Sequence, residues 1–217
     1  WGDHQRATDR LVAEMRVTAD GRTWLGLEDG TLITLRPDGH HQRFSPPAPS
    51  GRISAISTLP GGGVVTSTLK GQLQWHAADG SPLRAVDLQA RCDLHRVEEV
   101  LPLGGGTLLI GTRGRGLWLL EQGQHCRRPR GMDQPPLSEA SIHHLKANAR
   151  ATAGEALILA GTDLGLLVTD GRQLLQHLRR DNSHLRDNEV ISLAPARDGM
   201  AWVGTYDGLH LLDRQSF

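Results

Sequence analysis

The chain has 217 residues, enough to bury a hydrophobic core of its own. Its 24 basic and 24 acidic residues balance, which argues against a protein that binds nucleic acid or an anionic membrane. No apolar run is long enough to cross a membrane, so we expect no direct membrane insertion by this segment.

Five segments of the chain repeat one pattern. An apolar strand ends in a small residue and, in most repeats, Thr; a short turn closed by Gly and a second apolar strand follow. The turn glycines are Gly30, Gly71, Gly116, Gly165 and Gly208, which are 41, 45, 49 and 43 residues apart. A period of about 40–50 residues made only of short strands is typical of a β-propeller, with one four-stranded blade per repeat.

We therefore predict an all-β fold, a β-propeller of five blade repeats with four antiparallel strands each and almost no helix. The repeats fill the chain, so we expect a single domain over residues 1–217. The blades are expected at residues 11–45, 52–89, 96–129, 141–180 and 189–217.

The fifth repeat shows the expected strands most clearly. Val190–Leu193 is the inner strand, residues 201–205 form the second strand, and Tyr206-Asp207-Gly208 is a tight hairpin before the third strand at 209–213. Both faces of a blade pack against neighbouring blades, which explains the nearly continuous apolar runs. Outer strands are predicted at residues 41–44, 83–88, 125–128 and 174–178 of the other repeats.

The last repeat lacks an outer strand, and residues 3–8 are predicted to supply it and so close a five-blade ring. A closed ring would cover the apolar faces of the first and last blades. We assign these faces to Val12, Met15 and Trp24 in the first blade and to Val190, Leu193 and Trp202 in the last. An arc of a larger, seven-blade propeller is the alternative. Residues 147–155 exceed the length other repeats need at this turn, so we expect an exposed, mobile loop.

Residues 188–213 have the sequence NEVISLAPARDGMAWVGTYDGLHLLD, and related hairpins recur at residues 19–26, 109–117 and 161–166. This pattern resembles the two-component regulator propeller repeat, over about residues 11 to 213. The resemblance implies the periplasmic sensory part of a bacterial membrane signalling protein, of the histidine kinase or diguanylate cyclase type. It also implies a fused or associated output module as partner.

The chain contains no phosphate-binding loop, HExxH, GxSxG or paired CxxC motif, and we expect no enzyme activity and no cofactor. The leading hypothesis is a non-catalytic sensor that binds a small polar ligand or a partner protein. In a propeller, the hairpins between the second and third strands share one face with the connections between blades. The candidate ligand-binding residues on that face are Asp29, Lys70, His95, Arg96, Arg113, Arg115, Asp163, Tyr206 and Asp207.

Two other functions remain open. One is a propeller lyase or hydrolase with a funnel of His143, His144 and Glu98 or Glu99. We expect no metal site, and His143 with Glu98 is a separate, weak alternative for one. The other is a scaffold that only binds proteins.

Cys92 and Cys126 match no metal or redox spacing. We expect two free thiols, with a disulfide as the alternative in an oxidising compartment.

Overall fold

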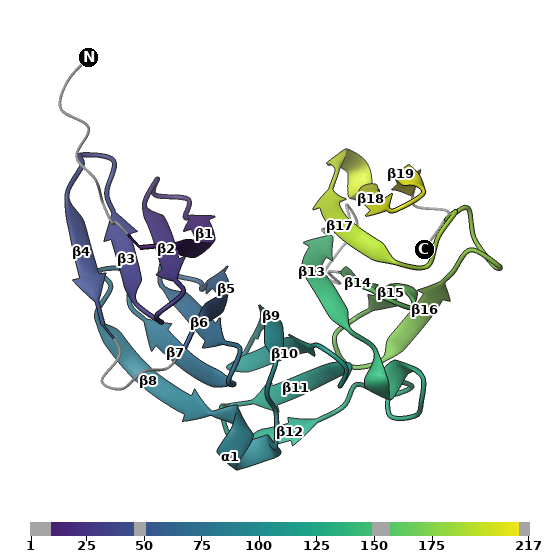
Figure 1. Cartoon of the computed structure of the whole chain (residues 1–217), viewed down its shortest axis with the longest axis horizontal. Helices are drawn as coiled ribbons and strands as arrows, with labels where there is room; N and C mark the ends of the chain where they lie inside the picture. The colour runs from purple at the N-terminus through teal and green to yellow at the C-terminus, as the bar shows by residue number, and fades with distance from the viewer. Residues whose placement is uncertain (1–9, 46–50, 149–156, 213–217) are drawn as a thin grey trace. The chain divides into compact units, whose positions relative to one another are not determined.

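A computed structural model of the chain describes residues 10–45, 51–148 and 157–212. The chain divides into two compact units, Trp1–Val100 and Leu101–Phe217. Both consist of antiparallel sheets whose strands follow one another in chain order (Figure 1). This arrangement confirms the predicted repeat of four-stranded, blade-like sheets.

The first unit holds two complete sheets and the beginning of a third. The first sheet is β1(Val12–Val17), β2(Thr23–Leu27), β3(Leu32–Leu35) and β4(His41–Phe44). The second is β5(Ile53–Thr58), β6(Val64–Thr68), β7(Gln72–His76) and β8(Pro82–Asp87). The third sheet starts with β9(Val97–Gly104), which runs across the boundary between the units.

The second unit completes the third sheet and holds the fourth and fifth. The third sheet continues with β10(Thr107–Thr112), β11(Leu117–Glu121) and β12(His125–Arg127). The fourth is β13(Ile142–Asn148), β14(Leu157–Thr162), β15(Gly165–Thr169) and β16(Leu174–Leu178). Within the described residues the fifth sheet has three strands, β17(Val190–Pro195), β18(Ala201–Thr205) and β19(Gly208–Leu212).

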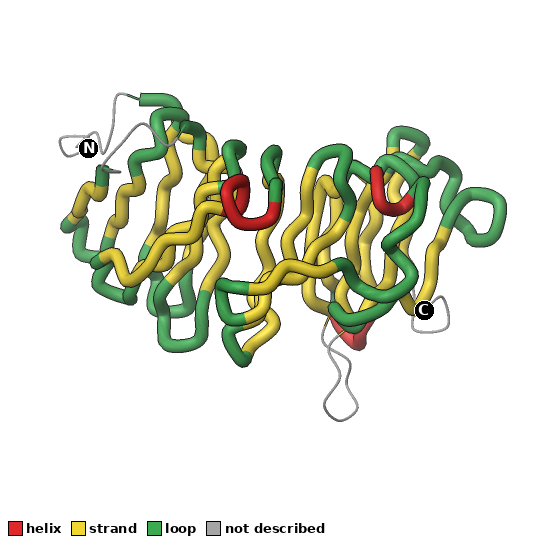
Figure 2. Tube along the Cα trace, turned by 90° about the horizontal axis from the view of Figure 1, so that it is seen from below, coloured by secondary structure: helices red, strands yellow, loops and turns green. Residues whose placement is uncertain are grey.

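Helix is nearly absent, as predicted. The described residues form one α-helix, α1(Leu88–Cys92), and two single 3₁₀ turns, η1(Leu137–Glu139) and η2(Arg197–Gly199). All three lie in connections between strands (Figure 2). No helix in the described part of the chain is long and apolar enough to cross a membrane.

The Thr and Gly of the repeat close the hairpins. At the end of β14 the hydroxyl of Thr162 donates to the carbonyl of Gly165 at 2.7 Å, and Thr112 donates to Gly116 at 2.8 Å in the third sheet. Gly165 has a φ of +123°, and a Cβ there would lie 2.3 Å from the carbonyl oxygen of Leu178. Only glycine fits this turn without strain, which explains why the repeat is recognisable from sequence.

Neighbouring sheets inside a unit pack the first strand of one sheet against the middle strands of the sheet before it. Ile53 and Ile56 of β5 share a buried cluster with Trp24 of β2. Gly26 makes this close approach feasible, because a Cβ there would lie 2.6 Å from Ile53 Cγ2. Between the fourth and fifth sheets, the equivalent cluster contains Val190 and Leu193 of β17.

The assignment of Trp24, Val190 and Leu193 to outer faces of the terminal blades was therefore wrong. All three side chains are buried against a neighbouring sheet: Trp24 packs against the following sheet, and Val190 and Leu193 pack against the preceding one. Trp202 of β18 occupies the position of Trp24, with 42% exposure against 0%. Met15 of β1 and Ile56 of β5 occupy equivalent positions, but the side chain of Met15 is 63% exposed and that of Ile56 only 2%.

In the first and fifth sheets, exposed apolar residues thus occupy positions that are buried between sheets elsewhere in the described residues. Val12 and Met15 expose such positions on β1, and Leu209 and Leu211 do so on β19. Their exposure reflects the packing surface of a sheet and is no evidence for a separate binding patch.

The predicted excursion at residues 147–155 begins later than expected. Ala147 and Asn148 still belong to β13, paired with Ile158 and Leu157 of β14. Asn148 is buried, and its side-chain amide donates to the carbonyl of Gly199 at 2.8 Å. Residues 149–156 lie outside the described residues, as do residues 3–8, which were predicted to complete the last blade.

Both cysteines, Cys92 and Cys126, are disulfide-bonded, and no described cysteine is free. The expectation of two free thiols was wrong. Spacing along the chain cannot exclude a disulfide, because the bond depends on the distance between residues in the folded protein.

His76 on β7 is a buried titratable group that packs in the core of the first unit. Its ring centroid lies 6.3 Å from that of Trp24 and 6.1 Å from that of Phe44. Its Nδ1 lies 3.2 Å from the carbonyl oxygen of Gly80, so a neutral ring protonated at Nδ1 donates to this oxygen. Burial lowers the pKa of His76, and the hydrogen bond to Gly80 raises it by a smaller amount.

Acidification is expected to destabilise the chain through His76. The unfolded histidine takes up its proton near pH 6.5, whereas the folded one does so only at lower pH, so the free energy of unfolding falls as the pH drops below about 6.5. Urea denaturation at about pH 7.5 and about pH 5 measures this loss. His76→Asn should reduce the loss, and His40→Asn, at an exposed position, should not. An equal pH dependence in His76→Asn and the wild type would contradict the assignment.

Candidate functional site

The hairpins between second and third strands lie beside the connections that lead to the next sheet, as predicted. In the first unit the amide of Arg96 donates to the carbonyl of Leu69 at 2.6 Å. In the second unit the amide of Gly116 donates to Ala140 at 2.9 Å, and that of Asp163 donates to Ser141 at 3.3 Å. We call these adjoining turns the hairpin end of each unit.

The four predicted site residues of the first unit lie at its hairpin end. Lys70, His95 and Arg96 are exposed. Asp29 accepts a hydrogen bond from the amide of Thr31 at 3.0 Å and forms ion pairs with Arg10 and Arg43. The carboxylate of Asp29 therefore stabilises its own turn, whereas the other three side chains face solvent.

The five predicted site residues of the second unit lie in three successive hairpins. Arg113 is exposed and Arg115 half-buried in the turn between β10 and β11. Asp163, between β14 and β15, accepts a hydrogen bond from the amide of Ser141 at 2.8 Å and so fixes the connection beside it. Tyr206, with 72% exposure, and Asp207 project from the turn between β18 and β19. Ligand binding by these residues stays a prediction.

One aromatic and one cationic residue, Trp118 and Arg128, hold the turn between β10 and β11 in place. Neither was predicted as a site residue. The indole of Trp118 donates to the carbonyl of Arg115 at 2.8 Å, and Arg128 donates to the same oxygen at 3.0 Å. The Arg128 guanidinium stacks 4.3 Å from the centre of the Trp118 ring. Burial, followed by the neighbouring charge of Arg115, lowers the pKa of Arg128. The backbone carbonyl of Arg115 is thus held by two side chains.

The histidines of the alternative catalytic funnel contact the next sheet. His144 Nε2 lies 2.8 Å from the carbonyl oxygen of Ile191, and His143 Nε2 lies 4.0 Å from Glu189 Oε1. Glu98 and Glu99 belong to the first unit and both histidines to the second. Among the described residues, no group of three or more His, Cys, Asp or Glu side chains could hold a metal ion.

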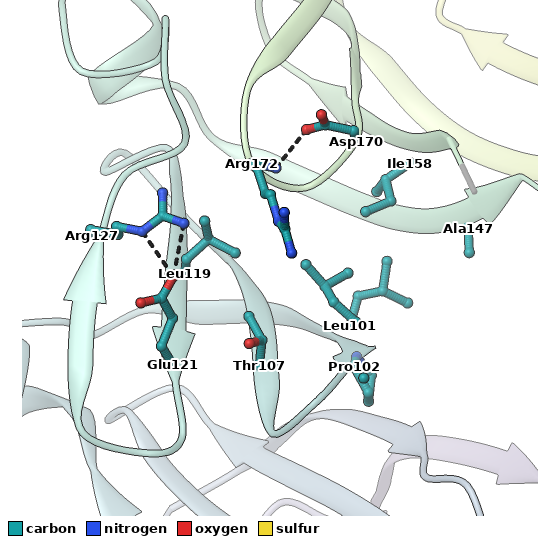
Figure 3. A pocket seen from close by; sticks show the side chains of 12 residues that line it. Leu101, Pro102, Thr107, Leu119, Glu121, Arg127, Ala147, Ile158, Asp170 and Arg172 are labelled. Atoms are coloured by element: carbon teal, nitrogen blue, oxygen red, sulfur yellow. Dashed lines mark hydrogen bonds and ion pairs between the residues drawn. The ribbon is translucent and has the colours of Figure 1, made fainter. Parts of the chain in front are cut away.

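A cavity of about 650 Å³ lies between the third and fourth sheets at the end of the second unit opposite to its hairpin end (Figure 3). Its apolar lining includes Leu101 and Leu103 of β9, Leu119 of β11, Ala147 of β13 and Ile158 of β14. The sequence does not reveal this cavity, because its apolar lining residues occupy ordinary strand positions and only the spacing of two sheets opens a space beside them.

The polar part of the cavity carries two positive and two negative side chains. Arg127 donates to Glu121 Oε1 from two nitrogens, at 2.9 and 2.8 Å. The carboxylate of Asp170 accepts hydrogen bonds from the amides of Arg172 and Gln173, at 2.7 and 2.8 Å. The Arg172 side chain points into the cavity toward Leu101 (Figure 3).

Comparison with known families identifies one repeat. A family model described as "Two component regulator propeller" matches residues 184–207, which cover β17, β18 and the turn of Tyr206 and Asp207. No curated protein matches the chain.

Solved structures share the fold at low sequence identity. The extracellular domain of the putative one component system BT4673 from B. thetaiotaomicron has a TM-score of 0.68 and 22% identity, over 96% of this chain and 28% of that one. PorZ of the type-IX secretion system of Porphyromonas gingivalis has a TM-score of 0.71 and 15% identity, over 99% of this chain and 34% of that one.

A β-propeller domain, that of Cps50 (Swd1) from Myceliophteria thermophila, has a TM-score of 0.70 and 16% identity, over 97% of this chain and 68% of that one. The chain spans only about a third of the two bacterial structures. It carries the two-component regulator propeller repeat on an all-β propeller fold.

Proposed function

We propose that this chain is a non-catalytic sensory propeller, the periplasmic input portion of a bacterial signal-transduction protein of the histidine kinase or diguanylate cyclase type. The observation that carries the proposal is the regulator propeller repeat at residues 184–207. Similar folds occur in the extracellular domains of putative one-component and hybrid two-component systems. The fold alone is compatible with many functions, so the repeat carries more weight than the fold.

The disulfide-bonded cysteines support an extracytoplasmic location. Disulfides persist in oxidising compartments such as the periplasm and are rare in the reducing cytosol. Both cysteines of the chain are oxidised.

Two exposed aspartates with a lowered pKa have a structural role in turns. The pKa of Asp79 is lowered mainly by the hydroxyl of Ser81, and that of Asp38 mainly by the amide of His40. These aspartates are exposed and cap turns between strands. The shifts of these two pKa values therefore have local structural causes.

We place the partner- or ligand-binding surface at the hairpin end of the second unit. Tyr206 is exposed on a short turn between two paired strands, so binding it costs little conformational freedom. Asp207 lies beside Tyr206, and Arg113 and Arg115 lie in the turn between β10 and β11. These side chains supply charges for a polar ligand.

The proposal predicts that Tyr206→Ala combined with Asp207→Ala alters signal output. In the full-length protein in membranes, phosphoryl transfer or cyclic di-GMP synthesis should change by about five-fold or more at unchanged abundance, since small coupling energies give such factors. Leu175→Ala, exposed on β16, is the control and should leave output unchanged. A full-length protein with neither activity, or turnover of a substrate by the purified chain, would refute the proposed function.

A further inference from the structure

We propose that the cavity between the third and fourth sheets binds a small monocarboxylate with an apolar body, and that Arg172 pairs with the carboxylate. This inference goes beyond the proposed function, because it assigns a separate ligand site to the second unit. It concerns the end of the second unit opposite to the predicted site residues.

The backbone of Arg172 is fixed on both sides. Its amide donates to Asp170 Oδ1 at 2.7 Å, and its carbonyl accepts from the amide of Arg130 at 2.8 Å. The amide of Leu174 donates to the carbonyl of Arg130 at 2.9 Å, so this segment bridges two sheets. The turn also packs tightly, because a Cβ on Gly171 would lie 2.6 Å from Leu103 Cδ1. A side chain on such a clamped turn loses little further freedom when it binds.

The guanidinium of Arg172 is available for a ligand. Within the described part of the chain it makes no hydrogen bond or ion pair, and it is exposed at the cavity. Arg127, on the other side of the same cavity, is already paired with Glu121 through two nitrogens. Arg172 is thus better able than Arg127 to bind an incoming carboxylate. An arginine can bind a carboxylate through two parallel hydrogen bonds.

The charges around the cavity favour a single negative charge on the ligand. Glu121 and Asp170 both line it, and each is held by donors of the protein. A monocarboxylate can neutralise Arg172 with one negative charge, whereas a phosphate dianion would add a second negative charge to a cavity that two carboxylates already line.

The walls of the cavity define the rest of the ligand. Leu101, Leu103, Leu119 and Ile158 form the apolar part of the lining. Leu101 lies next to the guanidinium of Arg172 (Figure 3). The volume of about 650 Å³ falls within the usual range for small-molecule sites, about 300–1,000 Å³. An aromatic or branched aliphatic group joined to one carboxylate fits both features.

The test uses 4-phenylbutyrate as the probe, in an NMR titration of the purified 217-residue chain. We expect saturable shifts at amides around the cavity. Arg172→Gln should weaken binding by about ten-fold to a hundred-fold, the usual range for a lost hydrogen bond to a charged group. The neutral 4-phenylbutanamide and the dianion phenyl phosphate should bind more weakly than 4-phenylbutyrate.

The matched control is Arg186→Gln, which removes the same charge at an exposed position of the second unit that does not line the cavity. It should keep binding within about three-fold of the wild type, since the charge of an exposed arginine outside the cavity is screened by solvent and salt. Leu101→Trp should fill the cavity and abolish binding, which provides a second variant should Arg172→Gln fail to fold. Circular dichroism checks the fold of each variant.

No binding at about 10 mM probe, equal binding of the amide, or equal losses in Arg172→Gln and Arg186→Gln would each overturn the inference. These outcomes leave the sensory role standing, since that role is tested by signal output after substitution at Tyr206 and Asp207. Conversely, a chain that binds the carboxylate while the full-length protein shows no output would refute only the proposed function.

Discussion

Replacing Cys92 and Cys126 together by Ser is expected to lower the free energy of unfolding by about 2–4 kcal/mol, the usual contribution of a native disulfide. The cross-link restricts the unfolded chain, so its loss raises the entropy of the unfolded state. Urea denaturation of the wild type and the double variant, both without reductant, measures the difference. Reduced wild type should unfold like the double variant.

A thiol count gives an independent check of the oxidised state. The unreduced, unfolded chain should show no thiol with Ellman's reagent, and the reduced chain should show both cysteines. Detection of both thiols without reductant, or identical unfolding midpoints for oxidised and reduced protein, would contradict the disulfide. It would also remove the argument for an oxidising compartment.

The strands of this fold were predictable because the repeat encodes its own turns. The expected outer strands at residues 41–44 and 174–178 coincide with β4 and β16, and the expected second strand at 201–205 coincides with β18. In each repeat a Gly is needed for a tight turn, and most repeats also carry a Thr whose hydroxyl closes the hairpin. These are local requirements, and a local requirement leaves a pattern along the chain.

Features that depend on two distant segments were harder to predict. Trp24 and Trp202 occupy the same place in their repeats, yet one is fully buried and the other is 42% exposed. The sequence pattern of a blade does not indicate which face of its sheet packs against which neighbouring sheet. The direction of sheet packing was therefore assigned incorrectly for Trp24, Val190 and Leu193.

The cavity was unpredictable for the same reason. Arg172 follows a turn Asp-Gly pair and looks like an ordinary exposed loop residue in the sequence. Its proposed role depends on Arg130, whose amide donates to the carbonyl of Arg172 and fixes this backbone across two sheets. It also depends on Glu121, which forms an ion pair with Arg127, the other arginine of the cavity. The predicted hairpin residues were easier to find, because short polar turns between apolar strands are exposed in any propeller.

The packing of the fourth sheet against the fifth leads to a second large expected effect. Gly161→Ala should lower the free energy of unfolding by about 1–3 kcal/mol, as expected for overpacking of a buried contact. The added Cβ would lie 2.7 Å from Val190 Cγ1 and 3.3 Å from Leu193 Cδ1, on the first strand of the next sheet. Neither side chain can move away freely, because both belong to the same buried cluster. Urea denaturation of the variant and the wild type measures the loss.

The control is Gly204→Ala, at the equivalent position of the fifth sheet. Neither glycine has a φ in the left-handed region, and the close neighbour of Gly204 is the hydroxyl of Ser192 at 2.2 Å, on an exposed side chain that can rotate. Its cost should stay within about 1 kcal/mol, partly offset by the lower entropy of the unfolded chain. Val190→Ala should relieve the clash, so the double variant with Gly161→Ala should be less destabilised than the two single losses combined, by about 0.5–3 kcal/mol. Additive losses, or equal effects at Gly161 and Gly204, would show that the fourth and fifth sheets do not pack through this contact.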